Sequence, residues 1–167
     1  MSSRPSNSVQ HDSVRRRCAA AVAAALLGAW RPAAAQGRVE LARATDLPRE
    51  LARALGAGRP LIVMVSLDGC PFCREVRDSH LGPLRDAQRQ PMVQLDMRSP
   101  QAVVALDGTA TTHGALIRTL RASVAPTLLF IGPGGREVAP RLSGFMADFY
   151  GAYLDDRLDV ALKAVKG

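Results

Sequence analysis

Residues 60–73 read PLIVMVSLDGCPFC, and this stretch decides the fold. Its first part, residues 61–67, is nearly unbroken apolar sequence, which is typical of a central strand buried on both faces of a sheet. Asp68-Gly69 then predicts a turn. Pro71 favours a helix start, because its missing N–H group costs nothing at the first helical position. The stretch therefore predicts a buried strand that leads through a turn into a helix carrying two cysteines.

These cysteines, Cys70 and Cys73, have the spacing of a redox pair. Cys70 falls at or near the helix N-cap, where unpaired backbone N–H groups and the helix dipole stabilise a thiolate over a thiol. Cys73 lies on the same helix face, one turn deeper. We expect Cys70 to be the nucleophile and Cys73 to resolve the mixed disulfide that it forms. Arg74 and Arg77 either add positive potential near Cys70 or form a solvated helix face.

The first 35 residues have the features of a secretory signal peptide. An arginine cluster at 15–17 precedes an apolar run at 18–30, which is shorter than the roughly 20 residues of a membrane-spanning helix. Three alanines then end at Ala35 and suit signal peptidase cleavage. We expect a cleaved signal peptide at 1–35, a leader at 36–44 and one domain at 45–167. A membrane-anchored form that faces the periplasm is the alternative.

Cleavage would leave two of the three cysteines, because Cys18 lies within the signal peptide. A structural disulfide framework in an oxidising compartment uses several cysteines at long spacings. A pair two residues apart closes a very short loop and constrains the unfolded chain little. Redox chemistry therefore explains Cys70 and Cys73 better than stability does.

Apolar periodicity, caps and turn residues predict the other elements. We expect a helix at 48–55 capped by Thr45 or Asp46, a strand at 91–96 parallel to the first, a short strand at 103–106, a helix capped by Thr112, a strand over 124–131, a returning antiparallel strand at 136–142 and a closing helix at 145–165. Gly82-Pro83 marks a kink or break in the helix that begins at Pro71.

A strand that leads into C-x-x-C, followed later by Ala125-Pro126-Thr127 and a glycine-rich hairpin, resembles the thioredoxin superfamily. The resemblance covers roughly Leu61 to the C-terminus. It implies an α/β fold with three α/β/α layers, a mixed central sheet and thiol-disulfide oxidoreductase activity. It also implies a cis bond between Ala125 and Pro126, which would line a substrate groove facing the cysteines.

The narrower resemblance is to periplasmic thioredoxin-like proteins of the SoxW type, on the signal peptide, the long segment between Asp96 and Pro126 and the closing stretch from Phe145 to Leu158. The chain departs from ordinary thioredoxins where the buried aspartate six residues before the first cysteine is Met64. The proton carrier for Cys73 is therefore open, with water, Asp68 and Glu75 as candidates.

The dipeptide Pro71-Phe72 is closer to the Pro-Tyr of glutaredoxins than to the Gly-Pro of thioredoxins, which leaves the redox poise open. Pro71, Phe72, Ala125 and Pro126 are the expected substrate-binding residues. Phe72 either offers an apolar contact to a protein substrate or is a partly buried packing residue.

Together these features predict an exported enzyme that reduces disulfides of periplasmic proteins and receives electrons from a membrane-linked thiol donor. We expect a monomer with no cofactor besides the Cys70–Cys73 disulfide. A disulfide-donating oxidase and a Cu(I)-binding module are the alternatives.

A structural zinc site is not expected, because His80 and His113 are isolated and no second C-x-x-C supplies further ligands. Nucleic-acid binding is not expected, since +4 of the formal charge of +7 lies in the signal peptide.

Overall fold

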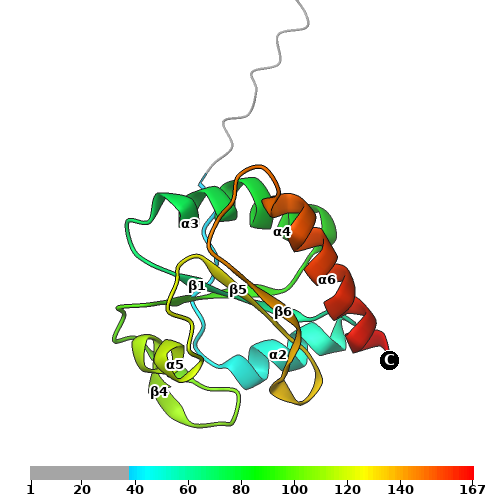
Figure 1. Ribbon diagram of the computed structural model, residues 1–167. Coiled ribbons are helices and arrows are strands. Elements are labelled where there is room, and N and C mark those ends of the chain that lie inside the picture. The colour runs from blue at the N-terminus through cyan, green and yellow to red at the C-terminus, as the bar shows by residue number, and fades with distance from the viewer. Residues whose placement is uncertain (1–37) are drawn as a thin grey trace, which may run out of the picture. The chain divides into compact units, whose positions relative to one another are not determined.

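The central sheet has four strands in the order β2-β1-β5-β6 (Figure 1). The computed structural model describes residues 38–167, so the predicted signal peptide lies outside the described residues. The strands are β1 at Leu61–Ser66, β2 at Met92–Asp96, β5 at Thr127–Ile131 and β6 at Glu137–Ser143. β1 pairs with β2 in parallel and with β5 antiparallel, and β5 pairs antiparallel with β6. The predicted mixed sheet is confirmed.

All six residues of β1 are buried, because helices cover both faces of the sheet. Alternate residues of β1 point to opposite faces. Leu61, Val63 and Val65 pack with α2 (Leu47–Gly56) and α5 (His113–Thr119). Ile62 and Met64 pack with the helical segment that begins at Pro71 and with α6 (Tyr150–Lys166). These are the three layers that the resemblance implies, and Figure 1 shows them.

The helix after the cysteine pair is interrupted, as Gly82-Pro83 predicts. It consists of α3 (Pro71–Glu75), a π-helical segment η1 (Val76–Leu81) and α4 (Gly82–Gln88). Proline lacks an N–H and its ring crowds the carbonyl four residues earlier, so the distortion falls before Pro83. The distortion begins after Glu75, so the first turn of the helix, which carries both cysteines, keeps α-helical geometry.

Three predicted boundaries differ from the structure. The strand expected over 124–131 begins only at Thr127, as β5. The strand expected at 103–106 is β3 (Ala102–Val104), and it pairs with an unpredicted strand β4 (Ala110–Thr112) in a separate small sheet. The closing helix begins at Tyr150, not at residue 145. Gly144 has a φ of 78° and turns the chain out of β6, and residues 147–149 form a turn before the helix starts.

The remaining predicted elements form close to their expected positions. Asp46 caps α2 by accepting the Arg49 N–H at 2.9 Å, and Thr112 caps α5 through Ala115 N–H at 3.3 Å. A 3-10 turn, η2 (Pro133–Gly135), joins β5 to β6. None of the helices within residues 38–167 combines the length and the apolar character needed to cross a bilayer.

Residues 38–44, which were expected to lie in a leader outside the domain, pack on it instead. Gln94 of β2 donates to Ala42 O and accepts from Ala44 N through its backbone, both at 2.9 Å. Leu41 is 8% exposed and Ala44 is fully buried. The sequence of residues 38–44 shows no clear apolar periodicity. Their packing could not be predicted from it, because the contact is with β2, a strand about 50 residues further along the chain. The described part of the expected leader therefore belongs to the domain.

Candidate dithiol active site

Cys70 lies at the N-cap of α3, directly after the turn that follows β1. Gly69 makes this turn with a φ of 73°, a left-handed conformation that favours glycine. The Cys70 Sγ accepts a hydrogen bond from the Cys73 N–H at 3.2 Å. An orphan helix N–H group thus points at this sulfur, as the sequence predicts. Cys70 is half-buried, so its sulfur is the reachable one.

Cys73 is fully buried one turn further along the helix. Burial raises the pKa of its thiol, and the hydrogen bond with Cys70 raises it further. The Leu67 backbone and the Ser66 side chain lower this pKa by smaller amounts. Both cysteines are free thiols in the structure. The site therefore combines a reachable sulfur with a buried one that favours its protonated form.

The Ala125–Pro126 bond is cis, as the resemblance implies. Ala125 and Cys70 both pack against the hydrophobic cluster that contains Cys73, and Pro126 is buried. The structure therefore brings Ala125 and both cysteines to one cluster, although the chain separates them widely.

Phe72 is 56% exposed, and its ring stacks on Phe145 with centroids 5.8 Å apart. Phe72 thus packs on a neighbouring ring and also presents exposed apolar surface, and its contact with a substrate stays a prediction. Met146 and Phe149, in the loop after Phe145, are also largely exposed. Pro71 is exposed at the first position of α3.

Neither histidine of the domain stands alone in solvent. His113 is fully buried: its Nδ1 accepts the Asp96 N–H at 3.2 Å, and its Nε2 lies 2.7 Å from Ala44 O. His80 packs on Tyr150, with ring centroids 4.9 Å apart. Burial lowers the pKa of His80. Both are therefore packing residues of the domain.

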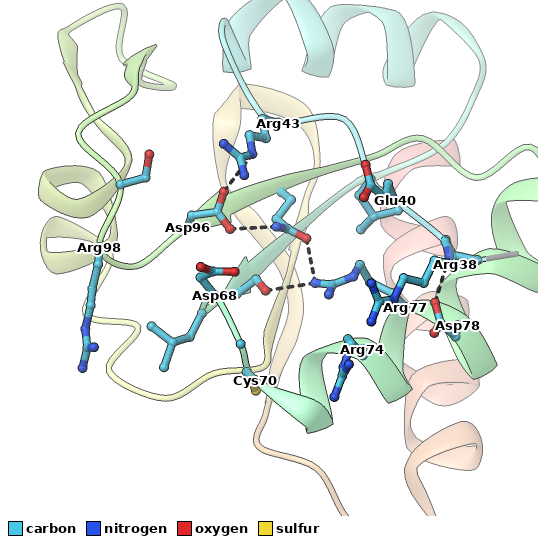
Figure 2. Close-up of a pocket in the computed structure, with 17 residues that line it drawn as sticks. Arg38, Glu40, Arg43, Asp68, Cys70, Arg74, Arg77, Asp78, Asp96 and Arg98 are labelled. Carbon is cyan, nitrogen blue, oxygen red and sulfur yellow. Dashed lines mark hydrogen bonds and ion pairs between the residues drawn. The ribbon is translucent and has the colours of Figure 1, made fainter.

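A polar cavity of about 740 Å³ opens beside Cys70, between α3, the end of β1 and the end of β2 (Figure 2). Five arginines and four acidic residues line it: Arg38, Arg43, Arg74, Arg77, Arg98, Glu40, Asp68, Asp78 and Asp96. Within residues 38–167 the structure has no group of three or more histidine, cysteine or acidic side chains arranged for a metal ion.

The cavity corrects the interpretation of Arg77 as part of a solvated helix face. Its Nη1 donates to Ser66 Oγ and to Gln94 Oε1, both at 3.0 Å. Arg74, by contrast, is exposed, as expected.

The sequence did not single out Ser66, Gln94 or Asp96 as residues of the site. The available signal was a lone polar residue, Ser66, at the end of an otherwise apolar strand.

A mixed sheet of this topology, with one reachable and one buried thiol where its central strand ends, defines the class of thioredoxin-fold thiol-disulfide oxidoreductases. A family model described as a thioredoxin-like domain matches residues 47–156. The chain belongs to this family.

Several solved structures are similar to this chain. DsbH oxidoreductase has a TM-score of 0.51 at 18% sequence identity, covering 80% of this chain and 90% of its own. A thioredoxin from Thermus thermophilus has a TM-score of 0.48 at 24% identity, covering 77% and 91%. The periplasmic thioredoxin SoxS from Paracoccus pantotrophus has a TM-score of 0.40 at 22% identity, covering 61% and 98%. No curated protein matches the chain.

Proposed function

We propose that this protein is an exported reductase that uses Cys70 and Cys73 to reduce disulfides of periplasmic proteins. The observation that carries the proposal is the pairing of a reachable Cys70 Sγ at a helix N-terminus with a fully buried Cys73 directly behind it. The sequence of the first 35 residues supports export. The electron donor in this proposal is a membrane-linked thiol protein.

The reaction takes place in two exchanges. The Cys70 thiolate attacks one sulfur of the substrate disulfide, and the other substrate sulfur leaves as a thiolate that takes up a proton. The Cys73 thiol then loses its proton and attacks Cys70 Sγ, which breaks the mixed disulfide and releases the second substrate thiolate. Two electrons pass to the substrate, and the protein is left with a Cys70–Cys73 disulfide for the donor to reduce.

The resemblance to periplasmic thioredoxin-like proteins of the SoxW type is what favours reduction over oxidation. Strong oxidants of this class owe their potential to a stabilised reduced form. The thiolate that they stabilise is that of the reachable cysteine at the helix N-terminus, so the raised pKa of the buried Cys73 does not decide the direction.

The surroundings of Cys70 support a protein substrate. Phe72 stacks on Phe145 and leaves more than half of its surface exposed. Ala125 packs against the cluster that contains Cys73, and its small, partly exposed side chain obstructs an extended segment less than a larger residue would. In this proposal Pro71 and Phe72 contact one side of the substrate chain, and Ala125 and Pro126 contact the other.

Insulin reduction and an equilibrium redox potential test the proposal. We expect Cys70→Ser to abolish turnover and Cys73→Ser to trap mixed disulfides, while Cys18→Ser, outside the domain, leaves turnover unchanged. We expect a potential nearer to about −270 mV than to about −120 mV, the two ends of the range of this class. A value near −120 mV would establish the oxidase instead. Tight Cu(I) uptake by the reduced protein without any disulfide turnover would establish the binding module.

A further inference from the structure

The face of β1 on which Cys73 of α3 packs lacks the buried acid of ordinary thioredoxins, because Met64 occupies that position and is fully buried. Ser66, two residues further along the strand, points to the same face. It is the last residue of β1 and is 1% exposed. Ser66 is therefore a polar side chain that β1 itself presents towards the resolving thiol.

The Ser66 hydroxyl accepts a hydrogen bond from Arg77 and keeps its own hydrogen free to donate. Arg77 Nη1 donates to Ser66 Oγ at 3.0 Å, and a guanidinium can only donate. The serine oxygen is the acceptor in this bond, so its own hydrogen stays available for another acceptor. The Ser66 side chain and Cys73 lie against the same face of β1, and Ser66 is one of the smaller influences that lower the pKa of the Cys73 thiol, against the larger rise that burial causes. A hydroxyl stabilises a thiolate in this way by donating to it.

Arg77 is itself held by Gln94 of β2, and Gln94 is held in turn by Asp96 of the same strand. The dashed lines in Figure 2 join Arg77 and Asp96 through this intermediate side chain. Gln94 Oε1 accepts from Arg77 Nη1 at 3.0 Å, and Gln94 Nε2 donates to Asp96 Oδ1 at 2.7 Å. An ionised carboxylate only accepts, so Asp96 fixes which end of the amide faces Arg77. Arg43 lies 3.3 Å from the second Asp96 oxygen. The chain of contacts from Asp96 to Ser66 has one consistent set of donors and acceptors.

We propose that Ser66 is the positioning residue for the resolving thiol Cys73, and that Arg77, held by Gln94 and Asp96, aims its hydroxyl. The inference rests on the proposed dithiol function. When Cys73 attacks Cys70 Sγ, its proton leaves to the solvent of the polar cavity, which Ser66 and Arg77 both line. The Ser66 O–H donates to the thiolate that remains. The pair thereby supports the step that a buried acid assists in ordinary thioredoxins.

Two other titratable groups face Cys73, and the test must separate them from Ser66. Cys70, at the start of α3, raises the pKa of Cys73. Tyr150, on α6, has a pKa raised by its burial and by the charge on Cys73. Both effects favour the protonated form of the Tyr150 hydroxyl. A Cys70→Ser background removes the first group and leaves Cys73 as the thiol of the domain that titrates.

The experiment is an ultraviolet thiolate titration of Cys73 in the full chain carrying Cys18→Ser and Cys70→Ser. We expect Ser66→Ala and Arg77→Gln to raise the pKa of Cys73, and Arg77→Lys, which keeps charge and donors, to raise it less. Arg74→Gln removes the same charge from an exposed position of the same helix and is expected to leave the titration unchanged. Urea unfolding of each variant checks that it is folded.

The same changes, made with both active-site cysteines present, slow the resolving step. Loss of one hydrogen bond to a charged sulfur leaves about tenfold less thiolate at neutral pH. A more basic thiolate is also more nucleophilic, so the step slows by only about threefold. Single-turnover release of a peptide from its mixed disulfide with Cys70 measures this rate.

An unchanged titration in Ser66→Ala overturns the proposal. An equal shift in Arg74→Gln and Arg77→Gln also overturns it, because the effect would then be a general loss of charge. The titration does not depend on turnover. If the wild-type chain reduces no disulfide while the expected shifts occur, the proposed function fails and the positioning role of Ser66 stands.

Discussion

Tyr150 heads the largest fully buried side chains of the domain, and its hydroxyl has no hydrogen-bond partner among residues 38–167. A buried hydroxyl left unpaired costs about 1–3 kcal/mol. We therefore expect Tyr150→Phe to raise the free energy of unfolding by about 1 kcal/mol, because the ring keeps its packing against His80 and Phe145. Tyr153→Phe, on the exposed side of the same helix, is the matched control and should change nothing. A lower stability for Tyr150→Phe would show that the hydroxyl is paired.

The stability difference between the wild-type chain and Tyr150→Phe also depends on pH. Burial raises the pKa of Tyr150 above its ordinary value of 10.0, so the folded state holds this proton more tightly than the unfolded state. The resulting stability is complete below pH 10 and is lost as the pH rises above it. We expect the urea midpoint of the wild-type chain to fall more steeply between pH 9 and pH 11 than that of Tyr150→Phe. Equal slopes would contradict the assignment.

Phe72 is the residue whose proposed role concerns the substrate alone. Because more than half of its side chain is exposed, Phe72→Ala should change stability little. If it contacts a protein substrate, the lost apolar area raises the KM for insulin about fivefold, corresponding to about 1 kcal/mol. Turnover of a small neutral disulfide such as hydroxyethyl disulfide should be unaffected. Val160→Ala, an exposed apolar residue far along α6, is the control.

At the scale of single elements, the sequence predicts what is local. The apolar run of β1, the Pro71 helix start and the caps Asp46 and Thr112 all depend on neighbouring residues, and the structure confirms them. Arg77 could not be interpreted in this way. Its helical neighbours indicate a solvated face, and only the packing of α3 against the ends of β1 and β2 brings Ser66 and Gln94 to it. Long-range contacts of this kind leave no periodic signal.

The segment 38–44 shows the same limit and provides the element-scale prediction. Leu41 and Ala44 are buried against the domain, and the backbone of this segment pairs with Gln94. Burying one leucine and one alanine accounts for roughly 2–3 kcal/mol. A chain that begins at Thr45 should therefore lose about that much free energy of unfolding relative to one that begins at Gly37.

The two shortened chains are compared by urea unfolding. The chain that begins at Thr45 also lacks Arg43, so Asp96 loses its ion pair and the thiolate titration of Cys73 should shift in the direction expected for Arg77→Gln. Arg43→Gln within the longer chain separates the loss of this charge from the loss of packing. Equal stability of the two shortened chains would restore 36–44 as a leader outside the domain.

At the scale of the whole molecule, the direction of electron flow is a question of relative stability. If the folded protein is more stable with the disulfide formed than with two thiols, folding favours the oxidised pair. The folded Cys70–Cys73 pair is then a stronger reductant than the same pair in the unfolded chain. Each 30 mV of difference corresponds to about 1.4 kcal/mol. Burial of Cys73 and its raised pKa give the reduced protein no thiolate stabilisation at this sulfur.

The proposed reductase direction predicts that the oxidised protein unfolds at a higher urea concentration than the reduced protein, with a difference of about 1–3 kcal/mol at pH 7. The difference should widen as the pH rises past the unfolded pKa of cysteine. The folded pKa of Cys73 is raised, so its contribution to the stability of the reduced form is present at low pH and is lost in alkali. The variant with serine at both active-site positions, with and without reductant, is the control. A reduced form more stable than the oxidised form would make the protein a disulfide donor.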